Sequence, residues 1–316
     1  MLNHCITPMT EPIVRIENLS HRYSVQWAIR DINFEIPRNG IYGLLGSNGA
    51  GKSTTMNIMC GVLKQTEGNV FIKGINMREQ PVEAKKHIGF LPQKPPLHPD
   101  LTVEEYLIHC ANLRMIPDGD IPAAVRKVMG KCGISHFQKR LIRNLSGGYQ
   151  QRLGIAQAII HEPDFVVLDE PTNGLDPNQI IEIRHLIKEI AENRTVVLST
   201  HILTEVQATC DHIQMIEEGH LVFAGTVDEF DNYIIPSTLF VTMLEAPPVE
   251  ELMTIPGVEH VEELGGHNYR VKFTDAHEVI EKMIEKNVTN GWRLVEIRVE
   301  KNSMDTIFAE LSKKVK

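Results

Sequence analysis

An octapeptide constrains this chain more than any other feature, because it fits the pattern G-x-x-x-x-G-K-S/T: Gly46, Ser47, Asn48, Gly49, Ala50, Gly51, Lys52 and Ser53. It follows the apolar run Ile41 to Leu45 and precedes the helical run Thr54 to Cys60. Glycines let backbone N–H groups turn inward around a polyphosphate, and a helix N-terminus adds partial positive charge. The motif therefore predicts a strand, a phosphate-binding loop and a helix.

Two side chains of this loop carry specific chemistry. Lys52 is expected to reach the β- and γ-phosphates, and the hydroxyl of Ser53 to ligate Mg²⁺. Thr54 follows and is grouped with the nucleotide-binding residues. The alternative is a glycine-rich turn with an accidental lysine, but the strand, loop and helix context favours a site for a nucleoside triphosphate.

Two carboxylates end another apolar run, Phe165 to Leu168. They are Asp169 and Glu170. Asp169 is predicted to hold Mg²⁺, and Glu170 to polarise the water that attacks the γ-phosphate. The alternative is a cap between strand and loop. A third apolar run, Thr195 to Leu198, leads into His201.

The three short apolar runs predict strands that are buried on both faces of a parallel α/β sheet. In such sheets ligands bind at the carboxyl ends of the strands. His201 is therefore expected near Asp169 and Lys52, with a hydrogen bond to the γ-phosphate; a purely structural histidine is the alternative.

Composition limits the remaining possibilities. With 316 residues, 42% of them hydrophobic, the chain can form one large or two ordinary domains. Its 32 basic and 41 acidic residues give a formal charge of −9, so no broad attraction to nucleic acid is expected. The five cysteines are scattered and are interpreted as reduced thiols. Neither a signal peptide nor an apolar stretch long enough to cross a bilayer is recognised.

A helical segment lies between the strands, from about Lys94 to Asn144. Thr102 and Glu105 have the spacing of a capping box, and Pro122 suits the first turn of a second helix. With the helix that follows it, this segment is predicted to form a helical subdomain over about residues 94–158.

A second domain is expected after a boundary near Asn232 to Ser237. Its predicted order is βαββαβ, over Leu239 to Leu244, Val249 to Met253, His260 to Leu264, Tyr269 to Phe273, His277 to Ile284 and Arg293 to Val299. Gly265 and Gly266 supply the hairpin turn. Met304 to Leu311 would add a helix. The predicted domains are a tail over residues 1–12, an α/β nucleotide-binding domain over 13–236 and a small α+β, ferredoxin-like domain over 237–316.

A second glycine-rich segment, Leu145 to Arg152, indicates which class of nucleotide-binding protein the sequence is similar to. Ser146 can cap a helix, Gly147 and Gly148 allow close approach of an anion, and a stripe is expected from Leu153, Ala156 and Ile160. The segment resembles the signature sequence of ABC ATPases, and the resemblance covers roughly Ile13 to Gly225. One departure is Tyr149, which stands where the family usually has glutamine, and altered contacts between subunits are expected from it.

The resemblance implies a P-loop ATPase in which Ser146, Gly147 and Gly148 close over ATP bound to another subunit, in a homodimer or heterodimer. By order and context, Tyr23 would stack on adenine and Gln93 would contact Mg²⁺ and water, whereas Leu175 and Asp176 would form a loop between subunits. Trp27 is interpreted as a packing residue. The helical segment resembles the part that contacts a membrane permease, which places the chain on the cytoplasmic face of the cell membrane.

The main hypothesis is the ATP-hydrolysing motor of a bacterial exporter. The C-terminal region resembles extensions on ATPase subunits of drug, polysaccharide, lipid and gliding-motility exporters; it either supports or regulates the dimer or is a stabilising appendage. A soluble ABC protein acting on ribosomes or damaged DNA is disfavoured, because the chain has neither a second phosphate loop nor a long coiled coil. A GTP-using switch protein is also disfavoured, because the sequence lacks the Asn/Thr-Lys-x-Asp motif that recognises the guanine base.

Overall fold

The computed structural model describes all residues except 1–10, 38, 235, 301 and 314–316. Most of the predicted tail over residues 1–12, and Cys5 with it, therefore lies outside the described residues. The described chain forms two compact units. The first runs to Val227 and resumes at Leu311, and the second comprises Asp228–Glu310. Each unit is described by itself.

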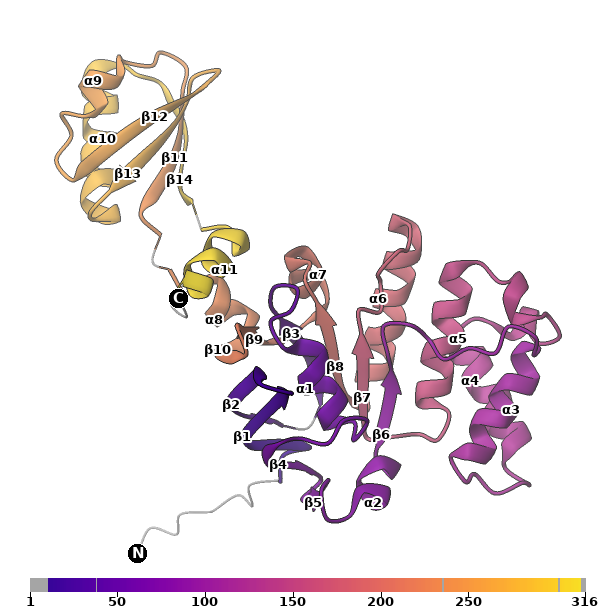
Figure 1. The fold of residues 1–316 in the computed structure, drawn as a ribbon. Helices are drawn as coiled ribbons and strands as arrows, with labels where there is room; N and C mark the ends of the chain where they lie inside the picture. Colours follow the sequence, from indigo (N-terminus) through magenta and orange to yellow (C-terminus); the bar gives the residue numbers. More distant parts are fainter. Residues whose placement is uncertain (1–10, 38, 235, 301, 314–316) are drawn as a thin grey trace, which may run out of the picture. The chain divides into compact units, whose positions relative to one another are not determined.

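A six-stranded sheet forms the centre of the first unit (Figure 1). Five neighbouring strands are parallel, and only the strand at one edge, β10, runs antiparallel. The three strands expected from the apolar runs are confirmed as β3, β7 and β8, and β7 and β8 are buried along their whole length. The strand order is β10 (His220–Thr226), β9 (His212–Glu217), β3 (Gly40–Leu45), β8 (Thr195–Thr200), β7 (Phe165–Asp169) and β6 (Ile88–Leu91).

A smaller antiparallel sheet shares the core of this unit. Its order is β2 (Gln26–Ile36), β1 (Val14–Tyr23), β4 (Glu67–Ile72) and β5 (Ile75–Asn76). Side chains of β1, β2 and β4 join those of β3 and the helix α1 (Lys52–Met59) in one hydrophobic cluster. Burying each large aliphatic side chain contributes about 1.5–3 kcal/mol. The shared core therefore packs α1 and β1 together against strand β3 of the central sheet.

The helices α2 (Pro81–Lys86), α6 (Pro177–Ala191) and α7 (Leu203–Thr209) accompany the six-stranded sheet. The predicted helical segment contains α3 (Val103–Leu113), α4 (Ile121–Lys131), the short 3₁₀ turns η1 (Ser135–Phe137) and η2 (Ile142–Asn144), and α5 (Gly147–Ile159). The capping box is confirmed, because Glu105 N–H donates to the Thr102 hydroxyl at 3.3 Å and Thr102 N–H donates to the Glu105 carboxylate at 2.8 Å. Pro122 lies in the first turn of α4, as expected.

The buried stripe expected on α5 is confirmed for Leu153, Ala156 and Ile160, but burial extends beyond it. Leu153 and Ala156 are buried, but so are Gly154, Ile155 and Gln157, which point in other directions around the helix. Burial on nearly all sides means that α5 lies inside the unit rather than on its surface. It packs against β6 and β7 as well as against α3 and α4.

The second unit contains the predicted series of six elements, in the predicted order: β11 (Thr238–Met243), α9 (Val249–Leu252), β12 (Val258–Gly265), β13 (Asn268–Phe273), α10 (Ala276–Asn290) and β14 (Leu294–Glu300). The strands form one antiparallel sheet in the order β12, β13, β11, β14. The helix α8 (Val227–Asp231) precedes this series and α11 (Met304–Lys313) follows it. The hairpin turn has positive φ at Gly265, Gly266 and His267, which explains the glycines there.

The sheet of the second unit, β12, β13, β11 and β14, is called the tail sheet below, and the second unit is called the tail unit. This sheet has one apolar and one charged face. Alternate residues of β11 and β13, such as Val241 and Val271, are buried in a core with Val279 and Met283 of α10. Arg270 belongs to the other set and forms ion pairs with neighbouring glutamates. This alternation is typical of an antiparallel sheet covered on one face.

No helix of the described residues is long and apolar enough to cross a membrane. The four described cysteines, Cys60, Cys110, Cys132 and Cys210, are buried free thiols, as expected.

Candidate functional site

A cleft of about 620 Å³ lies at the phosphate loop of the first unit. Nine of the residues proposed from the sequence line it: Tyr23, Asn48, Gly49, Gly51, Lys52, Ser53, Thr54, Gln93 and Glu170. Gly46, Ser47 and Ala50 belong to the loop without lining the cleft. The remaining wall comes from Gln26, Trp27, Ala28, Glu218 and Gly219. One cleft thus joins residues from β1, the phosphate loop, α1 and the ends of β6 and β7.

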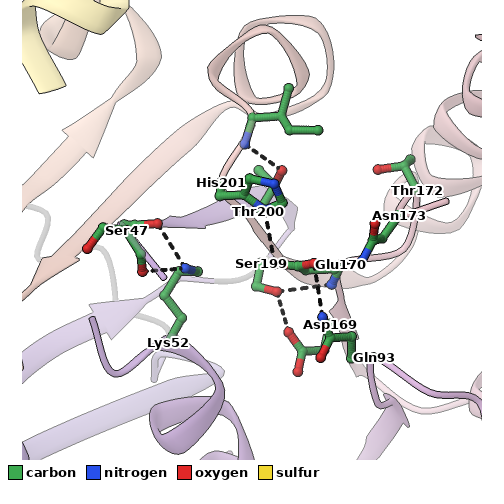
Figure 2. Close-up of polar contacts among 12 residues, drawn as sticks. Ser47, Lys52, Gln93, Asp169, Glu170, Thr172, Asn173, Ser199, Thr200 and His201 are labelled. Atoms are coloured by element: carbon green, nitrogen blue, oxygen red, sulfur yellow. Dashed lines mark hydrogen bonds and ion pairs between the residues drawn. The ribbon is translucent and has the colours of Figure 1, made fainter. Parts of the chain in front are cut away.

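Lys52 is held in place by the loop that carries it. Its side-chain Nζ donates to the carbonyl oxygens of Gly46 at 2.8 Å and Ser47 at 2.9 Å, and the residue is only 5% exposed (Figure 2). Burial lowers the pKa of the Lys52 ammonium, whereas nearby carboxylates, Glu170 first among them, act in the opposite direction. The ammonium is therefore positioned as a hydrogen-bond donor at the cradle before any phosphate binds.

Two glycines of the loop are required by space. A Cβ atom at Gly46 would lie 2.0 Å from the carbonyl oxygen of Ile216. At Gly51, φ is 110° and a Cβ atom would lie 2.5 Å from Cγ2 of Ile29. The loop can follow this path only because these positions lack a side chain.

Glu217, at the end of β9, anchors the same loop. Its carboxylate accepts hydrogen bonds from the Ser47 N–H at 3.1 Å and from the Ser47 hydroxyl at 2.6 Å. Sequence reasoning missed this buried residue, because the contact joins positions 170 residues apart. A carboxylate directly after the apolar residues of β9 was the available signal.

Asp169 and Glu170 meet a third residue, Ser199, at the end of β8. The Ser199 hydroxyl donates to Oδ1 of Asp169 at 2.5 Å and accepts the N–H of Glu170 at 3.0 Å (Figure 2). The parallel register places Asp169 opposite Ser199 on the adjacent strands β7 and β8. Sequence reasoning identified both carboxylates but not the serine that joins them.

The Glu170 carboxylate is surrounded by donors. Oε1 lies 3.1 Å from Nδ1 of His201, and Oε2 accepts from Nε2 of Gln93 at 3.1 Å and from Nδ2 of Asn173 at 3.1 Å (Figure 2). The structure thus brings together the three residues proposed as catalytic: Glu170, His201 and Gln93. Asn173 is an additional contact that the sequence did not reveal. Residues from three segments of the chain thus hold one carboxylate at the cleft.

The second glycine-rich segment lies elsewhere. Ser146, Gly147 and Gly148 are absent from the lining of the cleft. Ser146 occupies the N-cap position of α5, but the expected capping bond from its side chain is absent, so its exposed hydroxyl is free to meet another group. At Gly147 a Cβ atom would meet open space.

Two aromatic residues near these segments are placed differently from each other. Tyr149 packs edge-on against Phe137 at 4.5 Å and His136 at 5.7 Å between ring centroids, so it ties the start of α5 to η1. Trp27, interpreted as a packing residue, packs against the guanidinium groups of Arg22 and Arg30 and also lines the cleft with Tyr23, which is 52% exposed. The β1–β2 hairpin therefore places two aromatic rings at the cleft.

Asp176, which was expected in a loop between subunits, caps α6. Its carboxylate accepts the N–H groups of Asn178 and Gln179, each at 3.0 Å.

Comparison with known proteins agrees with this geometry. The family model described as ABC transporter matches residues 29–173. The bacitracin transport ATP-binding protein BcrA of Bacillus licheniformis is 38% identical over 212 residues, which cover 66% of this chain and 68% of BcrA. The ABC transporter ATP-binding protein YdbJ of Bacillus subtilis is 34% identical and extends over 86% of this chain and 84% of YdbJ. The chain belongs to the ABC transporter family. It is the ATP-binding subunit and hydrolyses ATP for transport.

Relatives also match beyond the ATPase region. The linearmycin resistance ATP-binding protein LnrL of Bacillus subtilis is 27% identical over 305 residues, 95% of this chain and 98% of LnrL. Among solved structures, the dimeric ATP-binding cassette MJ0796 bound to ADP and Pi is 26% identical with a TM-score of 0.61, and the match covers 68% of this chain and 98% of that one. The ABC fold is therefore shown for the first unit, and the antiparallel tail sheet is an addition to it.

Proposed function

We propose that this ATPase subunit drives export through a separate membrane permease. The observation that carries the proposal is that Lys52 and Glu170 line one cleft and that Ser199 links Glu170 to Asp169. Together these residues would hold a triphosphate and activate water against it. Export is supported by relatives named for bacitracin transport, lantibiotic transport and linearmycin resistance. The cargo would be selected by the permease.

The residues proposed to hold Mg²⁺ carry oxygen atoms that suit this ion. No group of three or more His, Cys, Asp or Glu side chains able to hold a metal occurs among the described residues. The Ser53 hydroxyl, the Asp169 carboxylate and the Gln93 amide are oxygen donors, and Mg²⁺ usually combines one or two carboxylates with waters and substrate phosphates. Bound Mg²⁺ would neutralise charge on the β- and γ-phosphates. The protein residues would orient it.

Glu170 is proposed to accept hydrogen bonding from the attacking water and to polarise it. The contacts from His201, Gln93 and Asn173 keep its carboxylate at the rim of the cleft. Closure that excludes bulk water would strengthen this interaction. General-base assistance of this kind contributes about 10²–10⁴-fold to the rate.

Two copies are proposed to close on ATP, with the Ser146 segment of one copy covering the cleft of the other. Three observations support this arrangement. The segment does not line its own cleft, its Ser146 hydroxyl makes no capping bond, and a related cassette is dimeric with ADP and Pi bound. Either two identical chains or two related ones would satisfy this geometry.

The test compares Glu170→Gln with the wild-type protein. We expect the variant to bind ATP, to accumulate as a closed dimer and to lose turnover by about 10²-fold or more, because the amide is a poor base. Glu262→Gln, on the tail sheet, is the control. ATP turnover, nucleotide binding and dimer mass are measured together. Near wild-type hydrolysis by Glu170→Gln would refute the assignment.

A groove beside the helical segment is proposed as the docking surface for the permease. It has a volume of about 520 Å³ and is lined by α2 and by the connection between α3 and α4. Leu113 and Met115 are both 68% exposed there, next to the basic side chains of Lys85, Lys86 and Arg114. Leu113→Glu should reduce the amount of this subunit that co-purifies with the permease. ATP hydrolysis by the free subunit should be unchanged.

The tail unit is proposed to be a ferredoxin-like domain that supports or regulates the dimer. Its βαββαβ order and antiparallel sheet support the fold assignment. The match of LnrL over 95% of the chain supports a role that requires this region. Deletion of the residues after Ser237 should weaken dimer formation or change ATP turnover. Unchanged dimerisation and turnover would reduce the tail to an appendage.

A further inference from the structure

Ser199 uses its single hydroxyl on both carboxylate residues of the site. The side chain is 0% exposed, donates to Oδ1 of Asp169 and accepts the N–H of Glu170 at 3.0 Å (Figure 2). The donor and one acceptor position of the hydroxyl are thereby occupied by two consecutive residues. The geometry points to Ser199 as a positioning residue for ATP hydrolysis, which orients the Asp169 carboxylate and fixes the Glu170 backbone. This inference rests on the proposed roles of those two residues.

The first part of this role concerns Asp169. Its side chain is buried, and a hydrogen bond from Ser199 satisfies one carboxylate oxygen. A hydrogen bond to an ionised group is shorter and stronger than one between neutral groups. The bond therefore restricts rotation of the carboxylate and leaves the second oxygen for the metal shell.

The second part concerns the backbone of Glu170. Its φ of 48° lies in the left-handed region, which residues other than glycine adopt only at an energetic cost. The Ser199 hydroxyl captures the N–H of this residue and so helps to maintain the conformation. This conformation aims the Glu170 carboxylate at Gln93 and His201. Without the Ser199 hydroxyl, the Glu170 backbone would be less firmly held, although the Glu170 carboxylate would still be present.

The same strand supplies a matched control. Thr195, at the other end of β8, is 2% exposed, and its hydroxyl accepts the N–H of Asn39 at 3.0 Å. Thr195→Val therefore removes one buried hydroxyl from β8 without touching Asp169 or Glu170. Ser199→Ala removes one buried hydroxyl beside both. A purely structural role predicts that the two substitutions behave alike.

The experiment measures steady-state hydrolysis by Ser199→Ala, Ser199→Thr and Thr195→Val at varied ATP and Mg²⁺. We expect Ser199→Ala to lower kcat about tenfold to a hundredfold, since hydrogen bonds to charged groups have that worth. KM for ATP should change little, and half-maximal activity should require more Mg²⁺. Ser199→Thr, which keeps the hydroxyl, should recover most of the rate. Thr195→Val should lower thermal stability alone.

A second measurement does not depend on turnover. Binding of Mn²⁺ to the ATP-loaded protein is compared in the Glu170→Gln background with and without Ser199→Ala, and weaker Mn²⁺ binding is expected with the alanine. Wild-type kcat and Mg²⁺ dependence in Ser199→Ala would overturn the inference, and so would equal losses of kcat in Ser199→Ala and Thr195→Val. High turnover by Glu170→Gln alone would instead reject the proposed base.

Discussion

The central sheet of the first unit and the sheet of the tail place their polar side chains in different ways. In the first unit, β7 and β8 are buried along their whole length, so charged groups such as Asp169 and Glu170 gather where β7 ends. In the tail sheet, buried and accessible residues alternate along β11 and β13. Arg270, for example, is paired with glutamates across the accessible face. A sheet covered on both faces concentrates chemistry at one edge, whereas a sheet covered on one face spreads its charges over a surface.

The largest expected difference is between substitutions of two lysines, one in the phosphate loop of the first unit and one in the tail sheet. Lys52→Ala should lower ATP turnover about a hundredfold to a thousandfold and weaken nucleotide binding, because it removes a preorganised donor to the phosphates. Lys272→Ala removes an exposed ion pair with Glu259 on the tail sheet and should leave turnover unchanged. Nucleotide binding and phosphate release are measured for both. Undiminished affinity and turnover in Lys52→Ala would end the assignment of the cleft.

The next effect separates two glycines. Gly46→Ala should destabilise the first unit by about 3 kcal/mol, because its new Cβ atom would lie 2.0 Å from the carbonyl oxygen of Ile216. Gly265→Ala, in the tail hairpin, meets open space but has a φ of 83°, so only about 1 kcal/mol is expected. Denaturant unfolding of the nucleotide-free variants measures both. Equal losses of unfolding free energy in the two variants would show that the backbone at Ile216 moves to make room for the new Cβ atom.

A smaller effect depends on pH. Burial lowers the pKa of His161 from 6.5 to about 4, and one ring nitrogen lies 3.0 Å from the Ile88 carbonyl oxygen. As the pH falls, the unfolded chain takes up a proton on His161 at a higher pH than the folded protein does. The contribution of the neutral ring to the free energy of unfolding is therefore complete above pH 6.5 and is lost as the pH falls towards 4. The size of this contribution is about 3 kcal/mol.

His161→Gln keeps an amide donor but cannot take up this proton. The difference in unfolding free energy between wild type and variant should therefore shrink between pH 6.5 and pH 4. Unfolding curves at several pH values measure this difference. Parallel pH profiles would contradict the burial of a neutral histidine.

The smallest effect belongs to the charged face of the tail. Arg270→Ala should cost at most about 1 kcal/mol, since its ion pairs with Glu262 and Glu300 are accessible to water and exposed pairs contribute little. Thermal unfolding at low and high salt measures this cost, and the difference between wild type and variant should narrow at high salt. A cost of several kcal/mol would mean that this face is covered in the assembled protein.

Much of the site could be predicted because its motifs are short and lie at the ends of strands. The loop over Gly46 to Ser53 and the pair Asp169 and Glu170 each follow an apolar run, and both lie at β-strand ends as expected. The roles of these residues and of Ser146, Gly147 and Gly148 stay predictions. Sequence reasoning failed where a contact depends on register, as for Ser199 and Glu217.

The sequence alone determined the strands β3, β7 and β8, the phosphate loop, the capping box at Thr102 and the order of the elements in the second unit, because each depends on residues close together in the chain. Only the tertiary structure decided that Ser199 joins Asp169 to Glu170, across 30 residues, and that Glu217 holds Ser47, across 170 residues. These contacts arise when neighbouring strands adopt one register. Local patterns specify that a strand exists, but packing decides which side chains meet at its end.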